Sequence, residues 1–524
     1  MRFAASGWTW GLAIIAAIAG TVVVVASPKL RTTLAEMART GQRSMHGHSV
    51  RVGKVAARPH KAVHGPLRVS SANPRYFADA GGKPVLLVGD HTWYTLQDSG
   101  PTDPPAAFDY ERFLDFLQAN DINFFRMFVW EQAKGSVGVR SSRYISPMPY
   151  RRSGPGLASD NKPKFDLSEF DQTYFDRLRD RVVGAGRRGV YVAVQLFEGF
   201  SVQRKPFMAA NSPWPGHPFN RHNNINGIDG DPNGNGEGEE TETLKIAAIT
   251  ALQEAYVEKV IETVNDLDNV LFEVCNECHS DSDAWQEHLI RYIHACESGR
   301  SKQHPIGRTV NWPDGDNAVL FASSAEWISP NGNGGYYDSP PAADGRKVIL
   351  NDTDHLCYPC GDRKWVWKSF LRGLNVAFMD PYDCSAEWSP KNCNPNDPAW
   401  VSLRSNLGYV RKFAARMNLI AMTPRGDLAS TGYCLSNVAT EADEYLVYLP
   451  SGGPVTVNLS AASGPLHVEW FNPSSGASST TGVVSGGSTR TFTSPFNGDA
   501  VLYIYQRGDV QWGERMSPEH GRTN

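Results

Sequence analysis

Acidic side chains stand at two places in the sequence where they could carry out acid–base and nucleophilic chemistry. Glu277 ends the segment 269–277, an apolar pattern typical of a buried strand that closes on Asn276-Glu277. A second group, Asp352-Thr353-Asp354-His355, follows the apolar run 348–350. A carboxyl that donates a proton and a carboxylate that attacks carbon can together cleave a bond in two steps. Glu277, Asp352 and Asp354 are therefore candidates for such chemistry.

Other polar and aromatic residues follow apolar runs in the same manner. At the ends of parallel strands such side chains are candidates for substrate contacts, with ordinary packing as the alternative for each. The candidates are Asp90, His91, Trp93, Arg126, Asn276, Asn311, Trp312, Trp327, His355 and Asp380. Glu131 and Glu198 are further carboxylates near the second and third runs.

A polar loop, residues 201–240, contains a pattern that resembles a calcium-binding loop. Oxygen-bearing residues occupy its first, third, fifth and twelfth positions, namely Asp229, Asp231, Asn233 and Glu240. Against calcium, no helical pattern enters the loop and Gly236 occupies its usually apolar eighth position. This loop is a candidate site for a structural calcium ion, and the chemistry predicted for the acidic residues requires no cofactor.

Short apolar runs alternate with amphipathic helical patterns from Leu67 onward. This alternation is typical of βα units and parallel sheets. Eight runs can be counted, at residues 85–88, 122–128, 190–196, 270–274, 306–310, 327–328, 348–350 and 376–379. They predict a (β/α)8 TIM barrel over residues 66–427, in which the carboxyl ends of the strands face the active site.

The pattern changes after about residue 428 to strict alternation of apolar and polar residues. The alternating segments are 445–449, 455–459, 467–471 and 500–505, with Ser, Gly, Thr and Pro clusters between them. They predict a small antiparallel β-sandwich over residues 428–507, followed by a tail, 508–524.

The N-terminus predicts export. Met1-Arg2 precedes an apolar run, Trp8 to Ala26, so residues 1–26 are either a cleaved signal peptide or a signal anchor. Residues 27–65 contain many basic residues and a single acidic one, Glu36, which indicates a flexible basic linker. We therefore expect a secreted or periplasmic protein, tethered to a membrane through residues 8–26 if that segment is not cleaved.

The composition is that of a globular protein. Hydrophobic residues make up 41% and charged ones 20% of the 524 residues, and the net charge of -4 argues against a dedicated nucleic-acid binder. The many aromatic residues, among them 14 Trp and 19 Tyr, could stack on sugar rings.

Eight cysteines are consistent with an oxidising compartment. Cys384 and Cys393 form the easiest local disulfide. The two C-x-x-C pairs, at 275/278 and 357/360, could be disulfides, small buried thiols or part of a zinc site.

Four segments together resemble the cellulase-like barrels of clan A glycoside hydrolases. They are Gly89-Asp90-His91, Asn276-Glu277, the 352–355 group and residues 373–382. The sequence is similar to family 5 and to apiosidase-like proteins, which often carry a C-terminal module named for collagen binding. The resemblance covers about residues 67–506, and only the two carboxylate motifs are specific.

The resemblance implies a carbohydrate substrate and a retaining mechanism. Glu277 would be the general acid/base, and Asn276 would contact the sugar 2-hydroxyl. Asp352 or Asp354 would be the nucleophile, buttressed by Arg126. Many members of the clan have Glu in place of this Asp, so the shorter side chain is a departure from the family pattern.

Two other functions are compatible with the same residues. One is a non-catalytic carbohydrate- or matrix-binding protein on a barrel scaffold, since a fold does not dictate a function. The other is a metal-dependent hydrolase that uses Asp352, Asp354 and His355 as ligands.

Overall fold

The structure, a computed structural model, describes residues 63–137, 142–203, 212–358, 360–382, 384, 393–437 and 443–506. The predicted signal segment 1–26, most of the linker 27–65 and the tail 508–524 lie outside the described residues. No helix within the described ranges combines the length and apolar character needed to cross a membrane.

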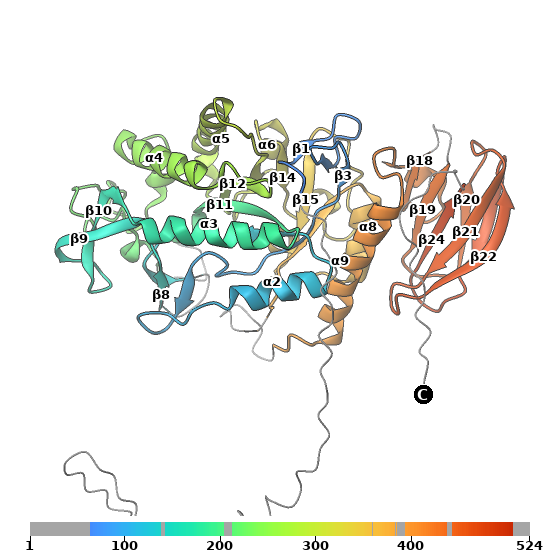
Figure 1. The fold of residues 1–524 in the computed structure, drawn as a ribbon, viewed down its shortest axis with the longest axis horizontal. Helices are drawn as coiled ribbons and strands as arrows, with labels where there is room; N and C mark the ends of the chain where they lie inside the picture. The colour runs from blue at the N-terminus through green and yellow to red at the C-terminus, as the bar shows by residue number, and fades with distance from the viewer. Residues whose placement is uncertain are drawn as a thin grey trace, which may run out of the picture. The chain divides into compact units, whose positions relative to one another are not determined.

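Eight parallel strands form a closed barrel, which confirms the predicted fold class (Figure 1). Each strand is hydrogen-bonded to the next in chain order, and the last pairs with the first. Strands that are buried on both faces form continuous apolar runs, and for this reason all eight could be counted in the sequence. They are β4 (Val88–Asp90), β6 (Phe124–Met127), β11 (Tyr191–Glu198), β12 (Val270–Asn276), β13 (Ile306–Thr309), β14 (Trp327–Ser329), β15 (Val348–Asp352) and β16 (Asn375–Phe378).

A small sheet closes the amino end of the barrel. It contains β1 (Arg68–Val69), β2 (Phe77–Ala78) and β3 (Pro84–Val85), so the run predicted as the first barrel strand begins in this sheet instead. Leu67 and Phe77 pack against Phe124, Leu271 and Trp327, which lie at or near the starts of barrel strands. Apolar side chains therefore fill this end of the barrel.

Helices surround the strands, and many begin at an aspartate. Asp109, Asp171, Asp316, Asp362 and Asp397 each accept a backbone N–H of the first helical turn, which satisfies a donor that the helix leaves unpaired. The helices that they cap are α2 (Tyr110–Ala119), α3 (Gln172–Arg187), α6 (Asn317–Ala322), α8 (Arg363–Leu371) and α9 (Pro398–Arg416); α4 (Ala247–Val264) and α5 (Asp283–Ser298) lack such a cap.

Five strands outside the barrel were not predicted. β5 (Asp98–Gly100), β8 (Ser142–Ser146) and β7 (Lys134–Ser136) form one sheet, and β9 (Tyr150–Leu157) pairs with β10 (Pro163–Phe170). None of the eight apolar runs of the sequence falls on these five strands. Residues 150–157 contain two Arg, two Gly and a Pro, residue types that are uncommon in strands or break them.

The C-terminal region is the predicted antiparallel sandwich. A six-stranded sheet, in the order β17-β18-β19-β24-β21-β22, accompanies a pair, β20-β23, and apolar residues of both form one core. The strands are β17 (Thr423–Pro424), β18 (Cys434–Asn437), β19 (Glu444–Leu449), β20 (Pro454–Asn458), β21 (Pro465–Phe471), β22 (Ser478–Ser485), β23 (Thr489–Thr493) and β24 (Ala500–Tyr505).

The sandwich shares an apolar cluster with the last barrel helices. Trp367 of α8 and Phe413 of α9 belong to the same cluster as Tyr448 and Phe471 of the sandwich. The ring of Trp367 stacks on that of Tyr448, with centroids 6.1 Å apart. The shared core makes the sandwich an extension of the barrel rather than a separately tethered module.

Candidate active site

Glu277 and Asp354 face each other at the carboxyl ends of two barrel strands. Glu277 directly follows β12, and Asp354 lies in α7 (Thr353–Leu356), the short helix after β15. One oxygen of each carboxylate and one ring nitrogen of His355 lie within 4.8 Å of one another. The barrel therefore brings the two predicted acidic motifs together.

Asp352 is held by other partners. Its Oδ1 accepts the backbone N–H of Asp354 at 3.0 Å and so caps α7, while its Oδ2 accepts a hydrogen bond from Arg126 Nη1 at 3.0 Å. Burial opposes ionisation of this carboxyl, but His91 and Arg126 outweigh the effect of burial and hold the pKa of Asp352 well below its usual range. Asp352 is thus a buried, charged anchor, and Asp354 is the carboxylate placed opposite Glu277.

Arg126 organises the buried charges below the pair. Its guanidinium binds Glu273 of β12 through two hydrogen bonds, of 2.8 and 2.5 Å, and also donates to Asn276 Oδ1 at 2.5 Å. Its Nη1 lies 3.0 Å from Asp352 and 3.5 Å from Asp354. A fully buried cation is stable only with such partners, so Arg126 fixes the positions of four side chains at once.

His355 is a neutral residue that orients its neighbours. Its Nε2 lies 3.1 Å from Asn276 Oδ1, and its Nδ1 lies 2.7 Å from Ser329 Oγ. Because Asn276 Oδ1 also accepts from Arg126, the hydrogen of His355 belongs on Nε2, and Nδ1 accepts from the Ser329 hydroxyl. Burial lowers the pKa of His355 well below its usual range, which keeps the ring uncharged.

The electrostatic environment raises the pKa of Asp354. Burial and the negative charges of Glu277 and Asp352 together raise this pKa to about 7, against the opposing effects of His91 and Arg126. Two carboxyls this close cannot both ionise freely and tend to share one proton. The pair can therefore present one proton donor and one carboxylate to the same substrate.

Two further acidic residues, Glu198 and Glu131, lie near Glu277 and Asp354. Glu198, the last residue of β11, accepts a 3.4 Å hydrogen bond from the amide of Asn276. Burial raises the pKa of Glu198 well above its usual range, and the charge of Glu277 adds to this. Glu131 accepts the backbone N–H of Glu198 at 2.8 Å. Both residues therefore support the wall next to Asn276.

The backbone at Glu277 adopts an uncommon conformation. Its φ is +48°, in the left-handed region, which costs a residue with a side chain about 1 kcal/mol or more. Gly199, the residue after β11, lies directly against this turn. A Cβ at position 199 would collide with the Glu277 carbonyl oxygen and come 2.7 Å from the Cα of Cys278, so only glycine fits.

Several predicted substrate-binding residues instead form the walls of the site. His91 stacks on Phe128, at 5.2 Å between centroids, and its Nδ1 lies 2.8 Å from Arg126 Nη1. Trp93 packs in the same aromatic cluster, with Phe128 at 5.6 Å. The carboxylate of Asp380 is bound by Arg404 of α9, at 2.6 Å for the Nε contact.

Asp90 is buried next to Asp380. Burial and the neighbouring Asp380 carboxylate raise the pKa of Asp90 well above its usual range. A carboxyl in this environment favours its protonated form. Asp90 and Asp380 are therefore buried close together at the carboxyl ends of β4 and β16, and substrate contact stays a prediction for both.

Trp327 was predicted to contact the substrate, and this prediction was wrong. It is the first residue of β14, only 2% exposed, and packs with Leu271 and Val348 inside the amino end of the barrel. Gly307 on the neighbouring strand leaves the space that its indole occupies. An apolar ring at a strand start faces the core, whereas the site lies at the strand ends.

Asn311 and Trp312 lie after β13, next to the Glu277 turn. Asn311 donates to Asp283 at 2.7 Å and accepts from Gln286 at 2.8 Å, so it anchors α5. Trp312 is half-buried, and its backbone N–H donates to the carbonyl of Cys278 at 3.1 Å. Trp312 is thus the better placed of the two for contact with a ligand.

The oxygen atoms of the calcium-like loop serve its own hydrogen bonds. Asp231 accepts the backbone N–H groups of Asn235 and Gly236 at 3.1 and 3.0 Å, and the amide of Asn233 donates to Glu240. Asp229 accepts the N–H of Asp231 at 3.2 Å. Calcium binding at these residues stays a prediction.

Three disulfides are present among the described residues. They join Cys275 to Cys278, Cys357 to Cys360, and Cys384 to Cys393, while Cys296 and Cys434 lie outside them. The local pair 384–393 is confirmed. Of the three alternatives for each C-x-x-C pair, the structure has the disulfide.

Glu273 and Gly199 are site residues that the sequence analysis missed. A glutamate in the middle of an otherwise apolar strand needs a buried cation, and Arg126 in another apolar strand was available to supply it. This pairing could have been predicted. The role of Gly199 depends on a close backbone approach that no local sequence pattern indicates.

Comparisons with known proteins agree with this architecture. The family model described as "Putative collagen-binding domain of a collagenase" matches residues 430–504. A solved structure titled "Glycoside hydrolase" is 13% identical with a TM-score of 0.54, covering 84% of this chain and 96% of that one. A glycoside hydrolase family 5 structure from Bacteroides vulgatus gives 13% identity and a TM-score of 0.54, with 85% and 95% covered. The sequence matches no curated protein.

At 13% identity, the similarity to these solved structures establishes the fold of this chain and not its function. The chain has the barrel architecture of glycoside hydrolase family 5 structures, followed by a sandwich that matches the collagen-binding family model. What this fold does here depends on the site.

Proposed function

We propose that this protein is a retaining glycoside hydrolase that cleaves a poly- or oligosaccharide. The observation that carries the proposal is the approach of Glu277 and Asp354, with a carboxylate oxygen of each within 4.8 Å of the other. Retaining enzymes hold their two carboxyl groups about 5–5.5 Å apart, and inverting enzymes leave about 6.5–9.5 Å for a water molecule. The shorter spacing favours double displacement.

In the proposed reaction Glu277 is the acid/base and Asp354 the nucleophile. Protonated Glu277 donates to the departing glycosidic oxygen while Asp354 attacks the anomeric carbon and forms a glycosyl–enzyme ester. Glu277 then takes a proton from water, which attacks the same carbon and releases the sugar and the Asp354 carboxylate. Arg126, close to Asp354, stabilises this carboxylate when it leaves.

The stereochemistry of the first product tests this scheme. We expect NMR of the product formed at early times to show the same anomeric configuration as the substrate. Inversion would exclude a covalent intermediate.

Covalent labelling tests the choice of nucleophile. A 2-deoxy-2-fluoro glycosyl fluoride should trap the ester, and peptide mapping by mass spectrometry should place the label on Asp354. A label on Asp352 would contradict the assignment while leaving retention intact.

The geometry favours this mechanism over a metal-dependent one. Both ring nitrogens of His355 are engaged, with Asn276 and with Ser329, and the Arg126 guanidinium lies 3.5 Å from Asp354, where it would repel a cation. We expect full hydrolysis in excess chelator. Loss of activity that added metal restores would favour the metal-dependent hydrolase instead.

We further propose that the enzyme works outside the cytoplasm. Three disulfides suit an oxidising compartment, and the apolar segment 8–26 would direct export. The collagen-binding description of the matched family suggests a matrix ligand for the sandwich. Fractionation of expressing cells should place the protein in the periplasm, membrane or medium, and recovery in the cytosol would refute export.

A further inference from the structure

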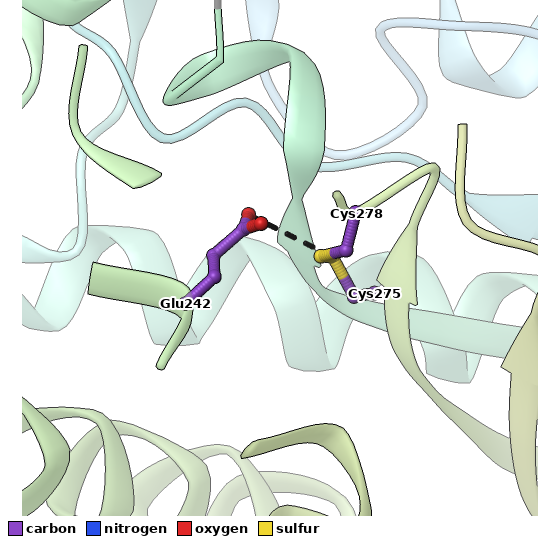
Figure 2. Close-up of side chains that lie close together, drawn as sticks. All are labelled: Glu242, Cys275 and Cys278. Atoms are coloured by element: carbon purple, nitrogen blue, oxygen red, sulfur yellow. Dashed lines mark hydrogen bonds between the residues drawn. A yellow bond between two sulfur atoms is a disulfide. The ribbon is translucent and has the colours of Figure 1, made fainter. Parts of the chain in front are cut away.

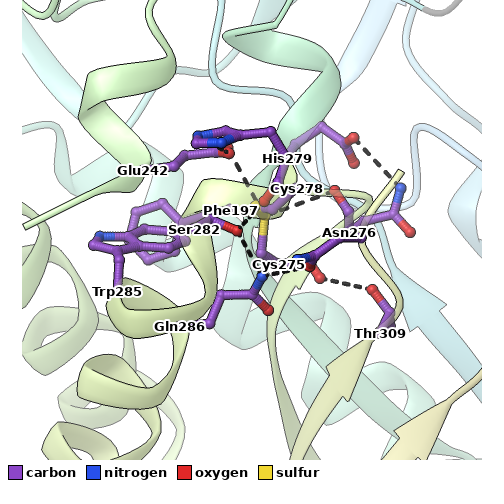
Figure 3. The surroundings of a disulfide bond; sticks show 12 residues. Phe197, Glu242, Cys275, Asn276, Cys278, His279, Ser282, Trp285, Gln286 and Thr309 are labelled. Carbon is purple, nitrogen blue, oxygen red and sulfur yellow. Dashed lines mark hydrogen bonds and ion pairs between the residues drawn. A yellow bond between two sulfur atoms is a disulfide. The ribbon is translucent and has the colours of Figure 1, made fainter. Parts of the chain in front are cut away.

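The Cys275–Cys278 disulfide encloses the proposed acid/base. Cys275 is the sixth residue of β12, Asn276 is the last, and Glu277 and Cys278 form the turn that follows. The bond therefore closes a small ring that contains Asn276 and Glu277 and no other whole residues. Figure 3 shows the disulfide between Cys275 and Cys278 with Asn276 beside it. The backbone that carries the general acid is thus covalently restrained on both sides.

This ring holds a turn that a free chain would seldom adopt. Glu277 has a positive φ of +48°, a conformation that L-residues rarely populate without external restraint. The backbone of Gly199 lies directly against the Glu277 carbonyl on one side of the turn. The carbonyl of Cys278 accepts a hydrogen bond from the backbone N–H of Trp312. The disulfide is the remaining, covalent restraint on the same turn.

The surroundings of the sulfurs protect the bond. Cys275 and Cys278 are each only 1% exposed and share an apolar cluster with Phe197 and Trp285. The carboxylate of buried Glu242 lies 3.8 Å from Cys275 Sγ (Figure 2). Burial keeps external thiolates, the species that exchange disulfides, away from both sulfurs. With the sulfurs joined, these residues also offer no thiolate ligands to a metal.

From this geometry we infer that Cys275 and Cys278 are positioning residues that act through Glu277. Their disulfide holds the Glu277 carboxyl at the angle from which it protonates the leaving group. The inference rests on the proposed function, because it assigns a task to the acid/base of that reaction. Loss of the disulfide should therefore impair proton donation far more than substrate binding or nucleophilic attack.

The dependence of the rate on the leaving group separates a loss of proton donation from a loss of substrate binding or nucleophilic attack. The probes are phenyl and 2,4-dinitrophenyl glycosides of the common hexoses and pentoses in both anomers. Departure of phenolate needs a proton, whereas 2,4-dinitrophenolate departs without one. For the double variant Cys275→Ala/Cys278→Ala we expect kcat/KM for the phenyl glycoside to fall roughly 100-fold, the lower range for loss of general acid catalysis. We expect kcat/KM for the dinitrophenyl glycoside, which reports formation of the ester and not its hydrolysis, to change less than about threefold.

The matched control removes a different disulfide. Cys384→Ala/Cys393→Ala eliminates a bond that does not enclose a proposed catalytic residue, and it should leave both rates within about twofold. Equal losses with both leaving groups, or no loss with either, would overturn the inference while the proposed function stands. A parent protein that hydrolyses no glycoside in the panel would overturn both.

If the double variant does not fold, a measurement on the parent protein tests the same inference. The full chain is reduced with a phosphine in enough denaturant to expose the buried bond, alkylated, returned to buffer, tested with both substrates and mapped by mass spectrometry. We expect the rate with the phenyl glycoside to fall in proportion to alkylation at Cys275 and Cys278. A full rate with these two cysteines alkylated would refute the inference.

Discussion

At the scale of single residues, the site separates two aspartates that the sequence leaves equivalent. Asp352 ends a strand, and its oxygens accept hydrogen bonds from the helix that follows and from Arg126, whereas Asp354, two residues further along the chain, lies opposite Glu277. Strand alternation alone could not decide between them, because the chain leaves the strand between the two residues. The decision depends on α7, a helix of only four residues.

The raised pKa of Asp354 predicts a shift when its neighbour loses its charge. With a dinitrophenyl glycoside, kcat/KM should rise with pH through about 7 as Asp354 ionises. In Glu277→Gln the same rise should occur at lower pH, because removing a nearby negative charge lowers the pKa of Asp354. The measurement is the pH profile of both proteins, with Glu262→Gln on the surface of α4 as control. An unchanged profile would show that the two carboxyls are not coupled.

The same variant distinguishes an enzyme from a binding protein. Glu277→Gln keeps the shape of the side chain and removes the proton donor, so we expect hydrolysis of phenyl glycosides to fall at least about 100-fold. Binding of oligosaccharide, measured by calorimetry, should persist. Undiminished hydrolysis would remove Glu277 from the mechanism.

At the scale of elements, the end of β11 positions the end of β12. Their parallel pairing continues to Glu198 and Asn276, and Gly199 then contacts the Glu277 turn. The strands themselves could be predicted from apolar runs, since burial on both faces leaves a clear pattern. The added sheets β5–β8–β7 and β9–β10 could not, because their polar and glycine-rich residues resemble those of loops.

A side chain at position 199 should displace the catalytic turn. We expect Gly199→Ala to reduce kcat by about 10- to 100-fold, since a shift of about 1 Å in a catalytic group can cost that much. Gly299→Ala is the control, because a Cβ there meets open space. Both variants should show parental circular dichroism. Parental kcat in Gly199→Ala would show that the turn accommodates the methyl group.

At the scale of the whole molecule, the barrel and the sandwich are joined by a common core. Arg363 of α8 binds Asp499 with hydrogen bonds of 2.8 and 3.1 Å, next to the stacked rings of Trp367 and Tyr448. Sequence alternation predicted the sandwich, but its attachment depends on side chains from distant segments. Only the folded chain reveals that α8 serves both parts.

Removal of the shared tryptophan should weaken both parts together. We expect Trp367→Ala to lower the free energy of unfolding by about 3–5 kcal/mol, as for other buried aromatic residues. Denaturant unfolding followed by circular dichroism and by residual hydrolysis should give coincident curves. Val483→Ala, on an exposed strand, should change stability by less than about 0.5 kcal/mol. Separate transitions would show that the two parts fold independently.

The packed amino end of the barrel has a consequence for the order of events in the proposed reaction. Leu67, Phe77 and Trp327 fill that end, so small molecules have no passage along the barrel axis. Incoming water and the departing aglycone must then use one and the same opening. The first fragment must therefore leave before water reaches the ester. A second sugar that arrives in that interval could attack the ester in place of water, and the product would then be a longer saccharide.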